Sequence, residues 1–577
     1  MDVKRLRLIS FFLCLNLIAS AQEYRALILP VQFPDLGFTY GPEEFDSLSD
    51  SLTLYFDAQF YGKASFRFET APVATLPKQY SYYGANSSEG PDFRIAEGIA
   101  EACRQVDPEV NFAAYSTDGR NVDKVLVLLP GKSETDTSDV NMFWPRYISL
   151  SESGEAPSLD GRRITNAGIF CEKGPEGGFT GIGTAAHEFG HALGLSDFYD
   201  TDGEGSGGRS KGLWGSLDLM DGGNRNAGGH VPPNLGAVNL YILGNGTPQT
   251  AEGPGHHILE PITESGRYLL VRNPAREEYF TIENRAAEGW DAFMGGSGLL
   301  VCHVDRSDTP AGWSDFYKVE LNAYERWEKN QVNCNPAYQC VEAVAADTVS
   351  VASVFFPYEG HTGLGPETVP PFVFNDGTPS QYSLLNITRE GRNVSFDLIR
   401  PIVINSIDVF QTTMIVTWKA DGAIGPVADN RLLAISGADT VATATCREIA
   451  DSLFSGTLDG LTPNREYTVK VLALCSDGSR HSALRTVKTH PYRSRVYPFI
   501  YLKSRERNAD GSFSPGARIP LQVFNAPDAV EIHWYMNDRE ISAADGAYTL
   551  RESGRLKVEL FREDGSKEVI VKEITVR

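Results

Sequence analysis

The sequence predicts several domains: an α/β domain, then a β-rich domain, then two β-sandwich modules. Three observations support this fold class. The chain has 577 residues, which is too long for one ordinary hydrophobic core. Apolar runs with both helix and strand periods continue to about residue 246, and short strand-like runs separated by turn residues follow. After residue 401 the pattern becomes typical of a β-sandwich.

Residues 1–21 have the composition of a secretory signal peptide. Lys4, Arg5 and Arg7 precede an apolar run over residues 8–18, and Ala19-Ser20-Ala21 fits the small-x-small rule for cleavage. The apolar run is shorter than the roughly 20 residues that a membrane span needs. We therefore expect a secreted, extracellular protein without a membrane span.

The residues expected to form the first domain, 22–246, alternate between strand and helix patterns. The run over residues 122–129 is almost continuously apolar, as a buried central strand should be, and residues 163–171 are expected at the sheet edge. Strands are predicted over residues 25–33, 122–129 and 163–171, and helices over residues 43–59 and 92–106.

The remaining residues are rich in strand patterns. In the β-rich domain, residues 247–400, strands are predicted over residues 267–272, 278–283 and 298–304. Residues 401–490 resemble a fibronectin type III domain, with Trp418 on an early strand and Tyr467 in a run that resembles the tyrosine corner. Residues 491–577 look like an Ig-like β-sandwich. The two modules either act as spacers or bind a surface partner or a carbohydrate.

The charge and the cysteines exclude some classes of function. The net charge is −23, so no basic stripe could outweigh the field of the whole chain, and we expect no nucleic-acid partner. Seven cysteines follow the signal peptide without any C-x-x-C spacing, which argues against a cysteine zinc site. Cys334 and Cys340 could close a small loop, and Cys446 and Cys475 could pair.

Residues 187–197, HEFGHALGLSD, contain the spacing of a metal site. His187 and His191 are four residues apart, so on a helix they lie on one face, about 6 Å apart along the axis. Two imidazoles in that arrangement can bind one metal ion. Gly194 can end the helix, and Asp197 then offers a carboxylate as the third ligand, with His230 as the alternative.

The same string predicts a catalytic base. H-E-x-x-H-x-x-G-x-x-D is a metzincin-type pattern, so we expect residues 22–246 to form a metzincin-like zinc peptidase domain. Glu188 follows the first ligand and can take a proton from a zinc-bound water, whose pKa the metal lowers to about 7. Met220 is expected to pack beneath the ligand histidines, unless it is an ordinary core methionine.

The motif and its surroundings resemble the immune inhibitor A family of secreted metallopeptidases. The resemblance rests on HEFGHALGLSDFYD with the preceding GIGT, on FYGKASF and FWP, and on EYFTIENR and GLLVCHVD, and it spans roughly residues 24–400. It implies that His187, His191 and Asp197 are zinc ligands and that Glu188 is the base.

Two acidic loops are candidate calcium sites on the basis of this resemblance and their composition. Residues 116–123 resemble a family loop that is richer in aspartate, and here Asp118 and Asp123 supply few hard ligands. Asp200, Asp202 and Glu204 form a second acidic loop, which is either a Ca²⁺ site or a solvated loop.

The sequence therefore predicts a secreted zinc-dependent endopeptidase that hydrolyses peptide bonds of proteins or peptides through a zinc-bound water activated by Glu188. Two alternatives remain open at this point. One is an extracellular adhesin or binding protein with a structural or vestigial zinc site. The other is an exopeptidase, which would cleave short free-ended peptides and leave long substrates intact.

Overall fold

The computed structural model describes residues 22–88, 90–491, 497–502, 506–526, 529–542, 546–563 and 565–577. The predicted signal peptide, residues 1–21, lies outside the described residues. The chain forms two compact units. The first contains the residues up to Glu252, His256–Thr362 and Asn386–Phe396, and the second contains Gly253–Gly255, Gly363–Leu385 and Asp397–Arg577. In the described part of the chain, no helix is both long and apolar enough to cross a membrane.

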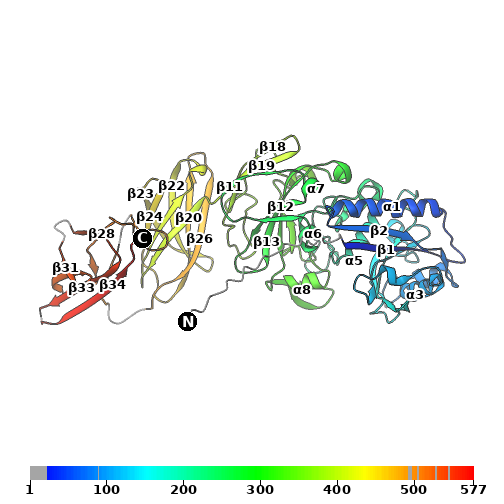
Figure 1. Cartoon of the computed structure of the whole chain (residues 1–577), viewed down its shortest axis with the longest axis horizontal. Helices are drawn as coiled ribbons and strands as arrows, with labels where there is room; N and C mark the ends of the chain where they lie inside the picture. The colour runs from blue at the N-terminus through cyan, green and yellow to red at the C-terminus, as the bar shows by residue number, and fades with distance from the viewer. Residues whose placement is uncertain are drawn as a thin grey trace, which may run out of the picture. The chain divides into compact units, whose positions relative to one another are not determined.

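The first unit starts with a six-stranded, mostly parallel sheet (Figure 1). Its order is β2 (Ala64–Thr70), β1 (Gln22–Gln32), β5 (Val125–Leu129), β9 (Asn166–Cys171) and β6 (Arg146–Ser149), with β3 (Ala74–Thr75) also paired to β1. Strands β2, β1, β5 and β9 are parallel. Strand β6 is antiparallel to β9 and forms the edge.

Helices cover both faces of this sheet. Ala26 and Ile28 of β1 belong to one core cluster, with residues of α1 (Pro42–Gln59) and α5 (Gly183–Ala192). Leu27 and Leu29 belong to a second cluster, with residues of α3 (Ile95–Val106). Since successive side chains of a strand point to opposite faces, the alternation in β1 builds two cores, and α1 and α3 lie on opposite sides in Figure 1. The expected α/β pattern is confirmed at this level.

Three element predictions need correction. Helix α3 begins at Ile95 instead of residue 92, because Asp92 takes a positive φ of 45° and a turn precedes the helix. The apolar run over residues 122–129 splits into β4 (Asn121–Val122) and β5. The run over residues 163–171 splits into β8 (Arg162–Ile164) and β9, and β9 is an inner strand, because β6 pairs with its outer side.

A second sheet completes the first unit. Its order is β10 (Thr247–Thr250), β12 (Arg267–Arg272), β13 (Glu278–Arg285), β14 (Gly298–Asp305) and β17 (Val341–Ala343), which confirms the three strands predicted there. Tyr55 of α1, Phe189 of α5, Tyr268 of β12 and Tyr279 of β13 belong to one hydrophobic core cluster. The predicted peptidase and β-rich domains therefore share a core in this unit.

The remaining elements are short. In the first unit they are α2 (Tyr80–Gly84), η1 (Phe112–Tyr115), α4 (Glu134–Thr137), β7 (Ser158–Leu159), η2 (Gly222–Gly229), α6 (Ala237–Ile242), α7 (Ile262–Ser265), η3 (Gly289–Phe293), β15 (Pro310–Ser314), β16 (Val319–Asn322), α8 (Ala323–Glu328) and η4 (Val351–Val354). Strands β11 (Gly255–Leu259), β19 (Asn393–Ile399) and β18 (Ser383–Glu390) form a small sheet in that order.

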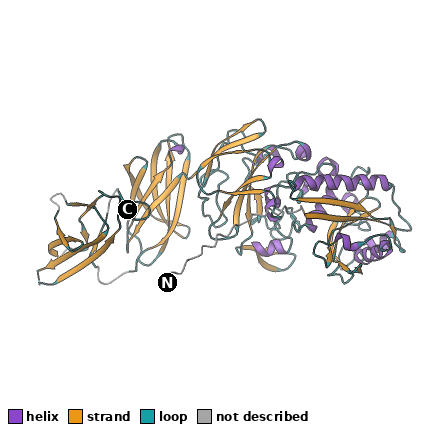
Figure 2. Ribbon diagram, in the orientation of Figure 1, coloured by secondary structure: helices purple, strands orange, loops and turns teal. Residues whose placement is uncertain are grey.

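The second unit is rich in strands and has two separate hydrophobic cores (Figure 2). Around the first core the strand order is β20 (Ile402–Val409), β21 (Met414–Ala420), β24 (Leu453–Leu458), β23 (Asp439–Ala450), β22 (Val427–Ser436), β25 (Glu466–Cys475) and β26 (Arg480–Lys488). Trp418 is fully buried there, and the Tyr467 hydroxyl accepts a hydrogen bond from the Thr462 backbone N–H at 2.8 Å, as a tyrosine corner would.

Around the second core lies a four-stranded sheet in the order β31 (Arg539–Ile541), β30 (Ala529–Met536), β33 (Gly554–Arg562) and β34 (Lys567–Ile574). Two short pairs accompany it, β27 (Phe499–Ile500) with β29 (Val523–Phe524) and β28 (Arg518–Pro520) with β32 (Ala547–Thr549). The two separate cores agree with the prediction of two β-sandwich modules.

Candidate metal centre

Close backbone packing holds the N-terminus of helix α5. A Cβ atom at Gly183 would lie 1.8 Å from the carbonyl oxygen of Asn224, and one at Gly181 would lie 2.2 Å from the backbone of Gly229. Contacts this short are impossible for any residue with a Cβ, so glycine at both positions lets α5 lie directly against η2. This packing fixes the start of the helix that presents the histidines.

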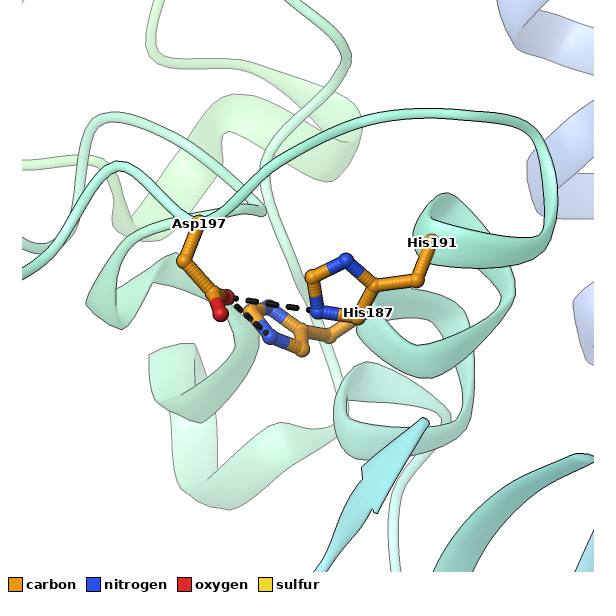
Figure 3. A group of neighbouring side chains, drawn as sticks. All are labelled: His187, His191 and Asp197. Atoms are coloured by element: carbon orange, nitrogen blue, oxygen red, sulfur yellow. Dashed lines mark ion pairs between the residues drawn. The ribbon is translucent and has the colours of Figure 1, made fainter. Parts of the chain in front are cut away.

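The helix ends so that a third side chain reaches the two histidines. Gly194 has φ +100°, which favours glycine, and the Leu195 N–H bonds to the Gly190 carbonyl at 3.0 Å as the chain turns back. Asp197 Oδ1 then lies 3.0 Å from His187 Nε2 and 3.3 Å from His191 Nε2 (Figure 3). Ligand atoms of these three residues all lie within 4.8 Å of one another.

Hydrogen bonds orient both imidazole rings. His187 Nδ1 is 2.8 Å from the Leu219 carbonyl oxygen, and His191 Nδ1 is 2.9 Å from that of Leu195. A carbonyl oxygen only accepts, so in each neutral ring the proton is on Nδ1 and the lone pair is on Nε2. Both lone pairs point at Asp197 Oδ1, a buried atom with no hydrogen-bond donor among the described residues.

Three lone pairs facing one another repel unless a cation lies between them. Two ligands at 2.0–2.1 Å from one zinc ion, in tetrahedral geometry, are about 3.3 Å apart. The observed separations of 3.0 and 3.3 Å agree with that value. The donor set also suits zinc, because imidazole and carboxylate are among its ordinary ligands. The residues therefore fit a zinc ion.

The pKa values of His187 and Asp197 also favour a positive charge between them. Burial lowers the pKa of His187, but the hydrogen bond that a protonated Nε2 can donate to Asp197 and the charge of that carboxylate outweigh burial and raise the pKa to about 9. Burial opposes ionisation of Asp197, yet the two imidazoles hold the pKa of its carboxyl well below the usual range. Both shifts favour positive charge at the place where the three groups meet.

Glu188 lies beside this group on the same helix. It is buried, and its Oε2 atom has no hydrogen-bond partner in the part of the chain that the structure describes. Burial raises the pKa of Glu188 to about 7, against the opposing influence of His187 and His191. A Cβ at Gly168 of β9 would lie 2.8 Å from the Glu188 Cβ, so the helix packs tightly on the sheet here.

Met220 packs under the helix, as expected from the sequence. Its side chain is fully buried, and a Cβ at Gly190 would lie 2.6 Å from its sulfur atom. The preceding residue, Leu219, supplies the carbonyl that orients His187. The turn that carries Met220 therefore contacts both the helix and the first histidine.

Comparison with known proteins identifies this part of the chain. The family model described as "Immune inhibitor A peptidase M6, catalytic domain" matches residues 170–235, which include the end of β9, the whole of α5 and the Met220 turn. This segment is similar to the catalytic domain of the immune inhibitor A peptidases. The resemblance seen in the sequence is thereby confirmed.

Relatives of the chain include the "Pre-pro-metalloprotease PrtV" of two strains of Vibrio cholerae serotype O1, M66-2 and ATCC 39315 / El Tor Inaba N16961. Each is 26% identical over 201 residues, covering 30% of this chain and 21% of the relative. The match thus spans about a fifth of the relatives' length.

Similarity to solved structures is weak. "Tandem Ig repeats of Dlar" is 15% identical, with a TM-score of 0.14, and covers 31% of this chain and 98% of that chain. "Crystal structure of the titin domains z1z2 in complex with telethonin" is 14% identical, with a TM-score of 0.12, and covers 30% and 96%. TM-scores this low carry no argument about the fold.

A cleft of about 330 Å³ opens beside His187 and Glu188. Its lining includes His187, Glu188, Tyr199, Trp144, Lys173 and Arg225. The Tyr199 ring stacks on His187 with centroids 6.2 Å apart. Tyr199 was not predicted as a site residue, although it follows Asp197 by only two residues.

A second missed residue contacts the third candidate ligand. Asn330 Nδ2 donates to Asp197 Oδ2 at 2.7 Å, and the Asp197 N–H donates to Asn330 Oδ1 at 2.7 Å. Asn330 comes 133 residues after Asp197. No pattern that was read from the sequence around Asn330 indicates a contact with a distant loop.

Other candidate ligands do not join the site. His230 is exposed and is not part of the His187, His191 and Asp197 group within the described residues. Asp118 accepts hydrogen bonds from the N–H groups of Arg120 and Asn121, whereas Asp123 pairs with Lys124.

The second acidic loop does not bring its three acidic residues together, and a Ca²⁺ site there stays a prediction. Asp200 and Asp202 lie near Cys334, and Glu204 instead pairs with Arg209 at 3.6 Å. Because calcium prefers oxygen ligands, a thiol in the third position does not favour Ca²⁺. All seven cysteines of the described residues are free thiols, so neither pairing considered from the sequence forms.

Proposed function

We propose that the protein is a secreted zinc-dependent endopeptidase that hydrolyses peptide bonds of protein substrates. His187, His191 and Asp197 hold the zinc ion, and Glu188 is the catalytic base. The observation that carries the proposal is the convergence of two Nε2 lone pairs and the unpartnered Asp197 Oδ1 beside Glu188. This group lies within the segment that matches the immune inhibitor A peptidases.

Backbone carbonyl groups of the chain orient the two histidine side chains of the centre. The carbonyl groups of Leu219 and Leu195 hold the two imidazole rings with Nε2 toward Asp197. Holding these tautomers raises the basicity of the ligand atoms and lowers the cost of ordering them on metal binding. The metzincin-like arrangement of the centre is part of the proposal, and the position of Met220 under α5 supports it.

Glu188 supplies the proton transfers. When bound, the zinc ion polarises the scissile carbonyl and makes a water molecule acidic enough to lose a proton near neutral pH. Glu188 lines the cleft, and its carboxylate would accept that proton and then pass it to the leaving amine.

Secretion and the nature of the C-terminal modules belong to the same proposal. The composition of residues 1–21 supports export, and the word "pre-pro" in the relatives' name agrees with it. The burial of Trp418 and the Tyr467–Thr462 hydrogen bond support a fibronectin type III-like module. A carbohydrate contact of these modules stays a prediction.

A casein digestion with and without a zinc chelator tests the proposal. We expect cleavage by the metal-replete protein, loss of cleavage after chelation, and recovery when zinc is added back. Short free-ended peptides assayed in parallel separate an endopeptidase from an exopeptidase. Stoichiometric zinc binding without cleavage of any of these substrates would support the binding-protein alternative and contradict the proposal.

A further inference from the structure

Asn330 is hydrogen-bonded to Asp197 at two points. Its amide nitrogen donates to Asp197 Oδ2, and its amide oxygen accepts from the Asp197 backbone N–H, both at 2.7 Å. Asp197 is only 4% exposed, so these bonds are shielded from water. The bond from the amide nitrogen satisfies Oδ2 of the carboxylate. The other carboxylate oxygen, Oδ1, is left facing the two imidazole nitrogens.

The local backbone explains why an asparagine occupies this position. Asn330 follows the last turn of α8 and has φ +52°. Asparagine adopts this left-handed conformation more readily than other residues with a Cβ, and it is common just beyond helix ends. The Asn330 N–H bonds to the Trp327 carbonyl at 3.3 Å, and its own carbonyl accepts from the Thr201 hydroxyl at 3.0 Å. The side chain is thus attached to an anchored backbone.

The segment around Asn330 supports the whole loop that carries Asp197. Residues 194–198 have no helix or strand of their own. The Asn333 amide donates to the Phe198 carbonyl at 2.8 Å, and the Ser196 hydroxyl donates to the Trp327 carbonyl at 3.4 Å. Together with Asn330, these bonds attach the loop to a part of the chain more than 125 residues away.

A neutral donor has a specific advantage beside a metal-binding carboxylate. A lysine or arginine would fix the carboxylate equally well, but its positive charge would repel the metal ion. The Asn330 amide orients the group while leaving its negative charge available. Partners of this kind typically contribute 10–100-fold to metal affinity.

We infer that Asn330 is a positioning residue of the metal centre, which holds the Asp197 carboxylate with one oxygen toward the zinc ion. The inference rests on the proposed function, because it assumes that His187, His191 and Asp197 hold zinc. It extends the centre beyond residues 170–235 to the segment after α8.

Zinc affinity of suitable variants tests the inference. Asn330→Gly keeps the left-handed backbone and removes the amide. Asn330→Ser is a second variant, because the serine side chain is too short to make both hydrogen bonds to Asp197. Asn464→Gly is the matched control, because Asn464 also has a positive φ, of 56°, and lies exposed in the second unit. His191→Ala tests the metal centre itself.

The measurements are the zinc dissociation constant, by competition with a fluorescent chelator, and the rise in melting temperature on adding zinc to the full chain. We expect Asn330→Gly and Asn330→Ser to raise the dissociation constant 10–100-fold and to reduce the zinc-induced rise, with Asn464→Gly unchanged. A purely structural role would lower the melting temperature of the zinc-free protein and leave the dissociation constant as it is.

The outcomes separate the two claims. If both Asn330 variants bind zinc as tightly as the wild-type chain while His191→Ala does not, the role of Asn330 is wrong and the metal centre stands. If His191→Ala binds zinc as tightly as the wild type, or the wild type binds none, the proposed function fails and the role of Asn330 fails with it.

Discussion

At the scale of single residues, the centre depends on the direction of lone pairs. His187 and His191 each bond a backbone carbonyl through Nδ1, so both Nε2 atoms point at Asp197 Oδ1. The carboxylate in turn keeps its direction through Asn330. A cation between these atoms removes the repulsion that the arrangement otherwise produces.

Asp197→Ala removes the only carboxylate among the three candidate ligands. We expect zinc to be lost on dialysis, with a drop in affinity larger than the 10–100-fold typical of an outer partner. Metal content by atomic emission, measured beside the wild type after the same dialysis, is the readout. Unchanged zinc stoichiometry in the variant would indicate another donor, of which His230 is the alternative.

The candidate residues could be predicted because their relation is local. His187, Glu188 and His191 lie within five residues on one helix, and Asp197 follows a glycine that ends it. Asn330 could not be predicted, because its contact depends on how α8 packs against the loop of Asp197. Hydrophobic periodicity and motif spacing do not encode such a tertiary contact.

At the scale of elements, α5 is held in place by what surrounds it. Gly181 and Gly183 allow its first turn to lie against η2, and Gly190 allows the Met220 side chain to pack beneath it. The apolar runs that contain β1, β5 and β9 were predicted as strands from sequence. The position of β9 inside the sheet was not predicted. Its neighbours are set by the pairing of β6, a four-residue strand that carries no strong apolar pattern.

Gly183→Ala tests the packing of the helix. The added Cβ would meet the Asn224 carbonyl oxygen at 1.8 Å, and because that atom is backbone, the helix or η2 must move. Overpacking of this kind costs about 1–3 kcal/mol, so we expect the melting temperature and the zinc affinity both to fall.

Gly178→Ala is the matched control for this change. No atom lies within 4 Å of a Cβ at Gly178, and its φ is not in the left-handed region. Its melting temperature should stay the same or rise slightly. Equal stability of the two variants would show that the contact between α5 and η2 is looser than the structure indicates.

At the scale of the molecule, the first unit is held together by a shared core. Tyr55 of α1 and Tyr279 of β13 belong to the same cluster, and the buried Arg285 of β13 donates to the Asn234 carbonyl at 3.1 Å and to Asp291. The sequence pattern separates these regions at residue 246, because the strand and helix periods change there. The hydrophobic period of the sequence shows where the secondary structure changes. It does not show which faces of the helices and sheets pack together.

A fragment of residues 22–246 therefore lacks the part of the shared core that β12, β13 and β14 supply. We expect it to show no cooperative thermal transition by circular dichroism and to bind zinc weakly, since it also lacks Asn330. A fragment of residues 22–400, prepared in the same way, should unfold cooperatively. Cooperative unfolding and full zinc affinity of the shorter fragment would contradict the shared core.

The measurement that tests the central claim most directly is the combined zinc content and casein-cleavage rate of Glu188→Gln. Glutamine preserves the shape of the side chain but cannot take up a proton. We predict one zinc ion per chain, as in the wild type, with a cleavage rate lower by about 10²–10⁴-fold. Cleavage at the wild-type rate by a zinc-loaded Glu188→Gln protein would contradict the account.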